Sequence, residues 1–294
     1  MLPETRSGVM IDQREIDNLN NILLPLICKQ GQSINQAYIN NPTTIMHSEK
    51  TIYKFIDLGL LKVRNIDLPR KVRFKQRKKQ STVYKIDKDC LTNRTYEDFQ
   101  KYLLHNPDIT IVQTDTVEGV KGGKVLLTIH FVNTSFMLAF IREHNDSQAV
   151  IDIFNNVQEL LGIDKFKKLF VVILTDNRSE FSNPTEIEFD METGELRTQI
   201  FYCHPSCPFE KSSCEVNHEL LRRILPKDTS FDDLSQSDIN LIMSHINSYK
   251  RKKLNFKSPY LMFSQIYGQD TIDKLGIQEI EPNNVSLSNS ILKK

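Results

Sequence analysis

Two aspartates follow segments whose composition predicts β-strands. Asp115 ends the segment Ile109–Asp115 (ITIVQTD), and Asp176 directly follows the apolar run Leu169–Thr175. If these strands are neighbours in one sheet, both carboxylates emerge at the same edge of that sheet. Convergent carboxylates suit Mg²⁺ or Mn²⁺, which bind hard oxygen ligands and keep positions open for water and phosphate. Strand-end aspartates also form turns and cap helices, and their spacing alone leaves that alternative open.

A third carboxylate is expected from a helix beside these strands. Glu215 lies in the first turns of the helix predicted over Ser213–Leu225. Glu219 lies one turn further along the same face and is the alternative ligand. Arg222 follows on that face, so its guanidinium either orients a phosphate of DNA or forms a surface salt bridge with Glu219.

Hydrophobic patterns place these acids in an α/β arrangement. Three successive segments rich in β-branched and aromatic residues predict a meander, and a later run that is apolar throughout predicts a strand buried on both faces. The predicted strands are Ile109–Asp115, Lys124–Asn133, Ser135–Ile141, Leu169–Thr175 and Gln199–Cys203, and the predicted helices are Tyr96–Leu104, Ser147–Gly162, Ser213–Leu225, Ser235–Lys252 and Pro259–Tyr267.

The N-terminal part of the chain predicts helices only. Apolar spacing of three to four residues marks helices over Asp12–Lys29 and Ile34–Asn40, and a third helix begins after Ser48 as its N-cap. This order is that of a helix-turn-helix module, in which the third helix reads a groove of DNA. The side chains facing the groove would then include Lys50, Tyr53 and Lys54. A three-helix bundle without DNA binding is the alternative.

A basic segment follows this helical region. It carries seven cations and no acid, namely Arg70, Lys71, Arg73, Lys75, Arg77, Lys78 and Lys79. Charge runs are usually solvated surface, but this density favours contact with phosphates and release of their counterions. We therefore expect a basic linker that binds DNA.

Composition excludes several classes of protein. The chain has 294 residues, of which 39% are hydrophobic, with 10 Gly and 11 Pro, so it is neither disordered nor collagen-like. No apolar run approaches the roughly 18 residues needed to cross a bilayer, and the N-terminus lacks the pattern of a secretion signal. The expected location is the cytoplasm, without contact with a membrane. The net charge of +1 does not by itself indicate a partner.

Five cysteines, an odd number, are expected to remain thiols in a reducing compartment. Three of them lie with two histidines just before and within the Glu215 helix, as Cys203, His204, Cys207, Cys214 and His218. Their spacing fits a structural zinc site only loosely, so zinc stays an open alternative. His218 is expected near the metal or the DNA instead.

The sequence words around the acids resemble a known family. TDTVEG at Thr114–Gly119, TDNRSEF at Thr175–Phe181 and CEVNHELLRRILPKDTSF at Cys214–Phe231 resemble the three acidic motifs of IS-thirty family transposases, the DDE-type enzymes of bacterial insertion sequences. The following segment DINLIMSHINSYKRKKLNFKSPYLMF also resembles that family, with Asn247 at the start of its signature. The resemblance covers roughly residues 109–268, which is more than half of the chain.

The resemblance implies an RNase H-like, retroviral-integrase-like catalytic domain with Asp115, Asp176 and Glu215 as its catalytic and metal-binding acids. Two Mg²⁺ or Mn²⁺ ions about 4 Å apart would activate water at a phosphodiester bond and stabilise the leaving 3′ oxygen. The freed 3′-hydroxyl would then attack target DNA. The implied partners are double-stranded DNA, namely the terminal repeats of the element and its target, and at least one further copy of the chain. The implied location is the bacterial cytoplasm, associated with the nucleoid.

The chain also departs from the family pattern. Arg178 stands where relatives usually have Gly, which commonly permits a left-handed turn beside the catalytic Asp. A family Trp-x-x-Gly-Ser stretch is replaced around Phe209 and Lys211, and Met1 lies too close to the first helix for a further N-terminal module. The alternatives are therefore a truncated, catalytically impaired fragment that binds DNA without transposing it, and a nuclease of the same fold.

The expected organisation has four parts. A helix-turn-helix-like region spans residues 1–67, a basic linker with a connecting helix spans 68–105, the integrase-like core spans 106–268, and a polar, mobile tail spans 269–294.

Overall fold

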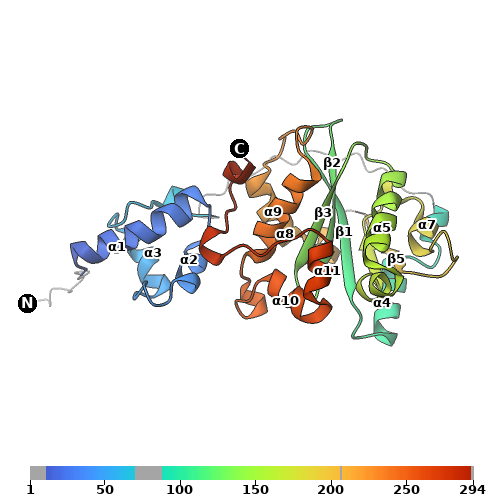
Figure 1. Cartoon of the computed structure of the whole chain (residues 1–294), viewed down its shortest axis with the longest axis horizontal. Coiled ribbons are helices and arrows are strands. Elements are labelled where there is room, and N and C mark those ends of the chain that lie inside the picture. Colours follow the sequence, from blue (N-terminus) through green and yellow to red (C-terminus); the bar gives the residue numbers. More distant parts are fainter. Residues whose placement is uncertain (1–10, 70–87, 206, 293–294) are drawn as a thin grey trace, which may run out of the picture. The chain divides into compact units, whose positions relative to one another are not determined.

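The computed structural model describes residues 11–69, 88–205 and 207–292 (Figure 1). The chain folds into two compact units. One, the helical unit, comprises Met1–Gln76 with Pro282–Ser288, and the other, the sheet unit, comprises Arg77–Glu281 with Asn289–Lys294. The predicted basic segment between Arg70 and Lys79 lies outside the described residues.

The helical unit contains the three helices expected from the sequence. These are α1 (Gln13–Leu24), which continues as a π-helical turn over Pro25–Lys29, α2 (Ile34–Asn40) and α3 (Glu49–Asp57). The hydroxyl of Ser48 accepts a hydrogen bond from the backbone N–H of Thr51 at 3.2 Å, so the predicted cap of α3 is confirmed. Apolar side chains from all three helices, among them Leu23, Ile34 and Ile52, form one buried core.

A segment from the far end of the chain completes the helical unit. We call Pro282–Ser288 the C-terminal strap. The buried side chain of Gln32 donates from Nε2 to the carbonyl oxygen of Val285 at 2.7 Å. The backbone N–H of Leu287 donates to the carbonyl oxygen of Gln30 at 2.7 Å. The side chains of Val285 and Leu287 are each only 2% exposed. The strap is therefore part of the folded unit.

The tail after Gly268 is a correction to the sequence-based expectation of mobility. It begins with α11 (Gln269–Lys274), and Ile272 and Ile277 are buried in addition to the apolar residues of the strap. These apolar positions are isolated among polar ones, so they produce no periodic signal although each is buried.

The sheet unit is built on five strands in the order β3-β2-β1-β4-β5. The strands are β1 (Ile111–Glu118), β2 (Val125–Phe131), β3 (Phe136–Arg142), β4 (Val172–Thr175) and β5 (Gln199–Tyr202). The first three pair antiparallel as a meander, and β4 and β5 continue the sheet in parallel to β1. This is the RNase H-like α/β topology expected from the sequence, so the predicted fold class is confirmed.

Helices cover both faces of this sheet. Figure 1 shows α4 and α5 on one side and α8 and α9 on the other. Phe99 of α4 packs with apolar residues of β4 and β5. The helices are α4 (Tyr96–His105), α5 (Ser147–Leu161), α6 (Ile163–Leu169), α7 (Pro184–Glu188), α8 (Ser212–Ile224), α9 (Gln236–Ser248) and α10 (Pro259–Tyr267). Among the described residues, no helix is long and apolar enough to cross a membrane.

Candidate metal centre

Asp115 and Asp176 lie side by side because of the register between their strands. Gln113 of β1 pairs with Leu174 of β4 in parallel, and each aspartate lies two residues further along its strand direction. Asp176 directly follows β4, as the sequence predicts. Asp115 instead lies within β1, which continues to Glu118 because it still pairs with the longer neighbour β2 there.

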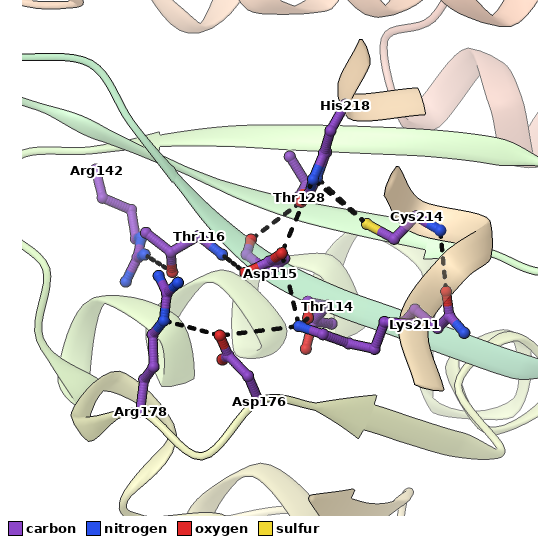
Figure 2. Close-up of polar contacts among 11 residues, drawn as sticks. Thr114, Asp115, Thr116, Thr128, Arg142, Asp176, Arg178, Lys211, Cys214 and His218 are labelled. Carbon is purple, nitrogen blue, oxygen red and sulfur yellow. Dashed lines mark hydrogen bonds and ion pairs between the residues drawn. The ribbon is translucent and has the colours of Figure 1, made fainter. Parts of the chain in front are cut away.

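The carboxylate of Asp115 faces two basic side chains (Figure 2). Its Oδ1 accepts a hydrogen bond from the backbone N–H of Thr116 at 2.9 Å. Its Oδ2 lies 3.6 Å from Nζ of Lys211 and 3.8 Å from Nδ1 of His218. Oδ2 is therefore the oxygen that points toward the surrounding groups.

One oxygen of the Asp176 carboxylate, Oδ2, faces two cationic side chains. Nε of Arg178 lies 2.8 Å from Oδ2, and Nζ of Lys211 lies 3.9 Å from the same atom. Its Oδ1 is buried and has no hydrogen-bond partner among the described residues. Burial raises the pKa of Asp176 to about 6; Lys211 and Arg178 oppose the shift, and Asp115 adds to it.

Lys211 is the functional residue that the sequence reasoning missed. It immediately precedes α8, its side chain is only 8% exposed, and its Nζ donates to the carbonyl oxygen of Thr114 at 3.0 Å. Burial lowers the pKa of Lys211, but Asp115 and Asp176 more than offset it, so the net pKa is raised. The ammonium group thus remains charged between the two aspartates.

α8 brings Glu215 and His218 to the same place. Among the described residues, Asp115, Glu215 and His218 form a group of possible metal ligands whose ligand atoms all lie within 4.8 Å of one another. Burial and the nearby Asp115 raise the pKa of Glu215. Asp176, although expected in the ligand set, lies outside this group.

α8 is fixed against β1 by hydrogen bonds as well as by packing. The backbone N–H of Cys214 donates to Oε1 of Gln113 at 3.1 Å, and Nη2 of Arg222 donates to the carbonyl oxygen of Glu118 at 2.8 Å. Glu219, the expected alternative partner of Arg222, forms an ion pair with Arg223 at 3.1 Å.

The sequence comparisons identify relatives of this chain. It is 27% identical over 163 residues to the transposase for insertion sequence element IS4351 of Bacteroides fragilis, covering 55% of this chain and 46% of the relative. It is 30% identical over 73 residues to transposase InsI for insertion sequence element IS30A of Escherichia coli (strain K12), covering 25% of this chain and 18% of the relative. Both relatives are insertion-sequence transposases. The resemblance to transposases of this family, expected from the sequence, is thereby confirmed.

The chain spans about half or less of the length of these transposases. No family model matches it. Among solved structures, the catalytic core domain of BIV integrase is similar, with a TM-score of 0.39, 14% identity and coverage of 53% of this chain and 93% of that one.

The position at which the family resemblance implies Gly is not strained in this chain. Arg178 has φ −113° and ψ 157°, which is extended backbone. The expected strain beside Asp176 is therefore absent, and the arginine is held by its ion pair with that aspartate.

The cysteine and histidine residues near α8 do not gather around one point. Cys203 is buried in an apolar cluster with Phe99 and Phe201, whereas His204 lies between Glu97 at 3.0 Å and Glu210 at 2.8 Å. Among the described residues, the group of possible metal ligands includes none of the cysteines. The zinc alternative has no geometric support.

The predicted DNA-contacting residues of α3 are only partly available at the surface. Lys50 and Lys54 are exposed and lie one helical turn apart, whereas Tyr53 is half-buried against the core of the helical unit. The two lysines therefore form a small basic face on α3.

Proposed function

We propose that the chain is a DDE-type DNA transposase. It would hydrolyse phosphodiester bonds at the ends of an insertion sequence and transfer the freed 3′-hydroxyl into target DNA. Two observations support this proposal in a chain that is similar to insertion-sequence transposases. The strand register brings Asp176 beside Asp115, and α8 brings Glu215 close to Asp115.

The residues at this edge fit a divalent metal ion. The carboxylates of Asp115 and Glu215 offer hard oxygen ligands close together, and the buried Oδ1 of Asp176 lacks a partner among the described residues. We propose that these three acids hold Mg²⁺ or Mn²⁺, as two ions. When bound, such ions lower the pKa of water and neutralise charge that develops on the phosphate.

The basic residues of the site have a separate role in this proposal. Lys211 compensates the charge of Asp115 and Asp176, which keeps two carboxylates close together without DNA. The side chain of Arg178 is 45% exposed, so its guanidinium is accessible to a phosphate while it pairs with Asp176. Arg222, whose Nη2 donates to the carbonyl oxygen of Glu118 at an exposed position, is the second arginine that we propose to contact DNA.

The proposed partner is double-stranded DNA, both the terminal repeats and the target. Lys50, Tyr53 and Lys54 of α3 are proposed to approach a groove, and the basic segment between Arg70 and Lys79 is proposed to contact phosphates. A homodimer or larger assembly is proposed because two element ends must be held together for joining.

The test is a cleavage and joining assay on a labelled duplex of the flanking terminal repeat, in Mg²⁺ and in Mn²⁺. We expect cleavage and joining by the natural chain and loss of both in Asp176→Asn. Asp152→Asn on the exposed face of α5 makes the same chemical change away from the site and should retain both activities. Cleavage that persists in Asp176→Asn would contradict the assignment of this acid.

A fragment that binds DNA without cutting it is the second candidate. The ion pair between Arg178 and Asp176 favours it, since a cation occupies one oxygen of a proposed ligand. Binding without cleavage by both proteins would support this candidate, whereas cleavage without joining would indicate a nuclease.

A further inference from the structure

The ring of His218 is oriented by Thr128 on the neighbouring strand β2 (Figure 2). The hydroxyl of Thr128 donates to the carbonyl oxygen of Asp115 at 3.0 Å and also lies 2.9 Å from Nε2 of His218. A hydroxyl has a single proton, and a carbonyl oxygen can only accept. The proton between Thr128 and His218 therefore belongs to Nε2, which donates to the threonine oxygen; Sγ of Cys214, a weak acceptor, lies 3.2 Å from the same nitrogen.

The other ring nitrogen is then the one that carries a lone pair. In neutral histidine one nitrogen is a donor and the other an acceptor. Nδ1 lies 3.8 Å from Oδ2 of Asp115, which is too long for a direct hydrogen bond. Nδ1 of His218 and Oδ2 of Asp115 are thus two electron-rich atoms that face each other across a gap. Glu215 offers a third possible ligand atom, and the ligand atoms of all three residues lie within 4.8 Å of one another.

We propose that His218 is a metal ligand of this centre, binding through Nδ1 beside Asp115 and Glu215, and that it makes the centre prefer Mn²⁺ to Mg²⁺. This deepens the proposed function and rests on it for the role of the ion in catalysis. The arrangement matches a general feature of metal-binding histidines, whose second nitrogen donates to a fixed oxygen that sets the tautomer and the ring orientation.

The preference for Mn²⁺ follows from the chemistry of the three ligands. Carboxylate and water oxygens suit both Mg²⁺ and Mn²⁺, but an imidazole nitrogen is a ligand of transition-metal ions rather than of Mg²⁺. Mg²⁺ also loses its bound waters reluctantly, so it exchanges a water for a nitrogen ligand less readily than Mn²⁺ does. One nitrogen ligand therefore discriminates between the two ions.

The competing explanation is a purely structural histidine. In that case the ring would be an imidazolium paired with Asp115, with Nδ1 also carrying a proton. Such a ring has no lone pair and cannot bind a metal, so the two explanations predict different spectra for bound Mn²⁺.

The experiment is a titration of the full chain with Mn²⁺ alone, followed by electron paramagnetic resonance. We expect bound Mn²⁺ whose pulsed spectrum shows hyperfine coupling to a histidine nitrogen. His218→Ala should remove that coupling and weaken Mn²⁺ binding at least about ten-fold, the scale for disturbing a metal ligand or its support. Mg²⁺ should displace Mn²⁺ more readily from His218→Ala than from the natural chain, because the remaining ligands of the variant are oxygens.

Two further variants control this experiment. His144→Ala changes an exposed histidine and should leave the coupling and the affinity unchanged. His218→Gln places an amide nitrogen near the position of Nε2, where it can donate to Thr128, so this variant keeps that hydrogen bond while removing the imidazole. Circular dichroism of both His218 variants should match that of the natural chain.

Three results would overturn the proposal: no binding of Mn²⁺, bound Mn²⁺ without nitrogen coupling, and coupling that persists in folded His218→Ala. The titration uses neither DNA nor catalysis, so its failure is distinct from failure of the proposed function. If bound Mn²⁺ shows coupling to a histidine nitrogen but the chain does not cleave DNA, only the proposed transposase activity is overturned. If the chain cleaves DNA in an Asp176-dependent way but bound Mn²⁺ shows no nitrogen coupling, only the assignment of His218 as a metal ligand is overturned.

Discussion

At the residue scale, the pairing of Arg178 with Asp176 bears on how the proposed metal ion would reach this carboxylate. Oδ2 of Asp176 contacts the guanidinium at 2.8 Å, whereas Oδ1 has no hydrogen-bond partner among the described residues. In the proposed centre a metal ion would bind Asp176 through Oδ1 or share Oδ2 with the guanidinium. In both arrangements Arg178 and the metal ion would compete for the same negative charge.

Removal of Arg178 should strengthen metal binding. We expect Arg178→Gly to bind Mg²⁺ and Mn²⁺ about two- to five-fold more tightly, the effect of losing a partly exposed ion pair. Arg178→Lys keeps the charge and should bind these ions more like the natural chain. Isothermal titration calorimetry measures both affinities, and unchanged or weaker binding in Arg178→Gly would contradict the competition.

The sequence predicted that the acids would lie close together, but it predicted only some of the basic residues that surround them. Asp176 follows an apolar strand and Glu215 begins an amphipathic helix, so their neighbourhood is encoded locally. The burial of Lys211 depends on how the turn before α8 packs against β1, for which the sequence carries no periodic signal. His218 was expected near the metal or the DNA; its Nδ1 lies 3.8 Å from Oδ2 of Asp115, and its place beside a metal stays a prediction.

At the element scale, the capped helix α3 presents its lysines as a pair. The Ser48 cap fixes the start of the helix, and Lys50 and Lys54 extend from its exposed side. Their spacing places both ammonium groups on one face. This is the described part of the helical unit that we propose to contact phosphates.

The lysine pair should contribute to the salt dependence of DNA binding. We expect the double variant Lys50→Gln and Lys54→Gln to reduce the slope of log affinity against log salt by about two units, since each lost phosphate contact removes about 0.9. Lys29→Gln with Lys62→Gln changes two other exposed lysines of the helical unit and should leave the slope nearly unchanged. Equal slopes for all three proteins would exclude α3 from the DNA interface.

Most element types were predictable, and the differences lie at boundaries set by tertiary contacts. α2 and α10 have their predicted bounds because capping serines and prolines mark them locally. The predicted strand from Leu169 starts later, since Phe166 and Leu169 are buried on a short helix, α6, that precedes β4. Apolar runs this short do not distinguish a strand from a buried helical turn.

At the scale of the whole molecule, the helical unit is assembled from both ends of the described chain. The C-terminal strap supplies two buried apolar side chains and accepts hydrogen bonds from Gln32 and Asn40. Gly31, with φ +67°, lies against the backbone of Leu287, and a Cβ there would approach its carbonyl oxygen to 3.3 Å. The fit of the strap therefore depends on a specific backbone conformation.

A charge placed within the strap should destabilise the helical unit selectively. We expect Leu287→Asp to increase amide hydrogen exchange throughout α2 and to lower the free energy of unfolding of this unit by several kcal/mol, because it buries an unpaired carboxylate. Asn284→Asp introduces the same charge at an exposed strap position and should change exchange little. Hydrogen exchange with mass spectrometry separates the two units, and equal protection of α2 in both variants would contradict a structural role for the strap.

The strap also has a consequence for how the protein is made. A ribosome synthesises α1, α2 and α3 first, and domains generally fold in that order as they emerge. Here the first helices must wait for Val285 and Leu287, which are added only after every strand of the sheet unit. A polypeptide whose translation stops after β5 but before the strap would therefore contain every strand of the sheet unit but an incomplete helical unit, so synthesis through Leu287 is a condition for completing the N-terminal helices.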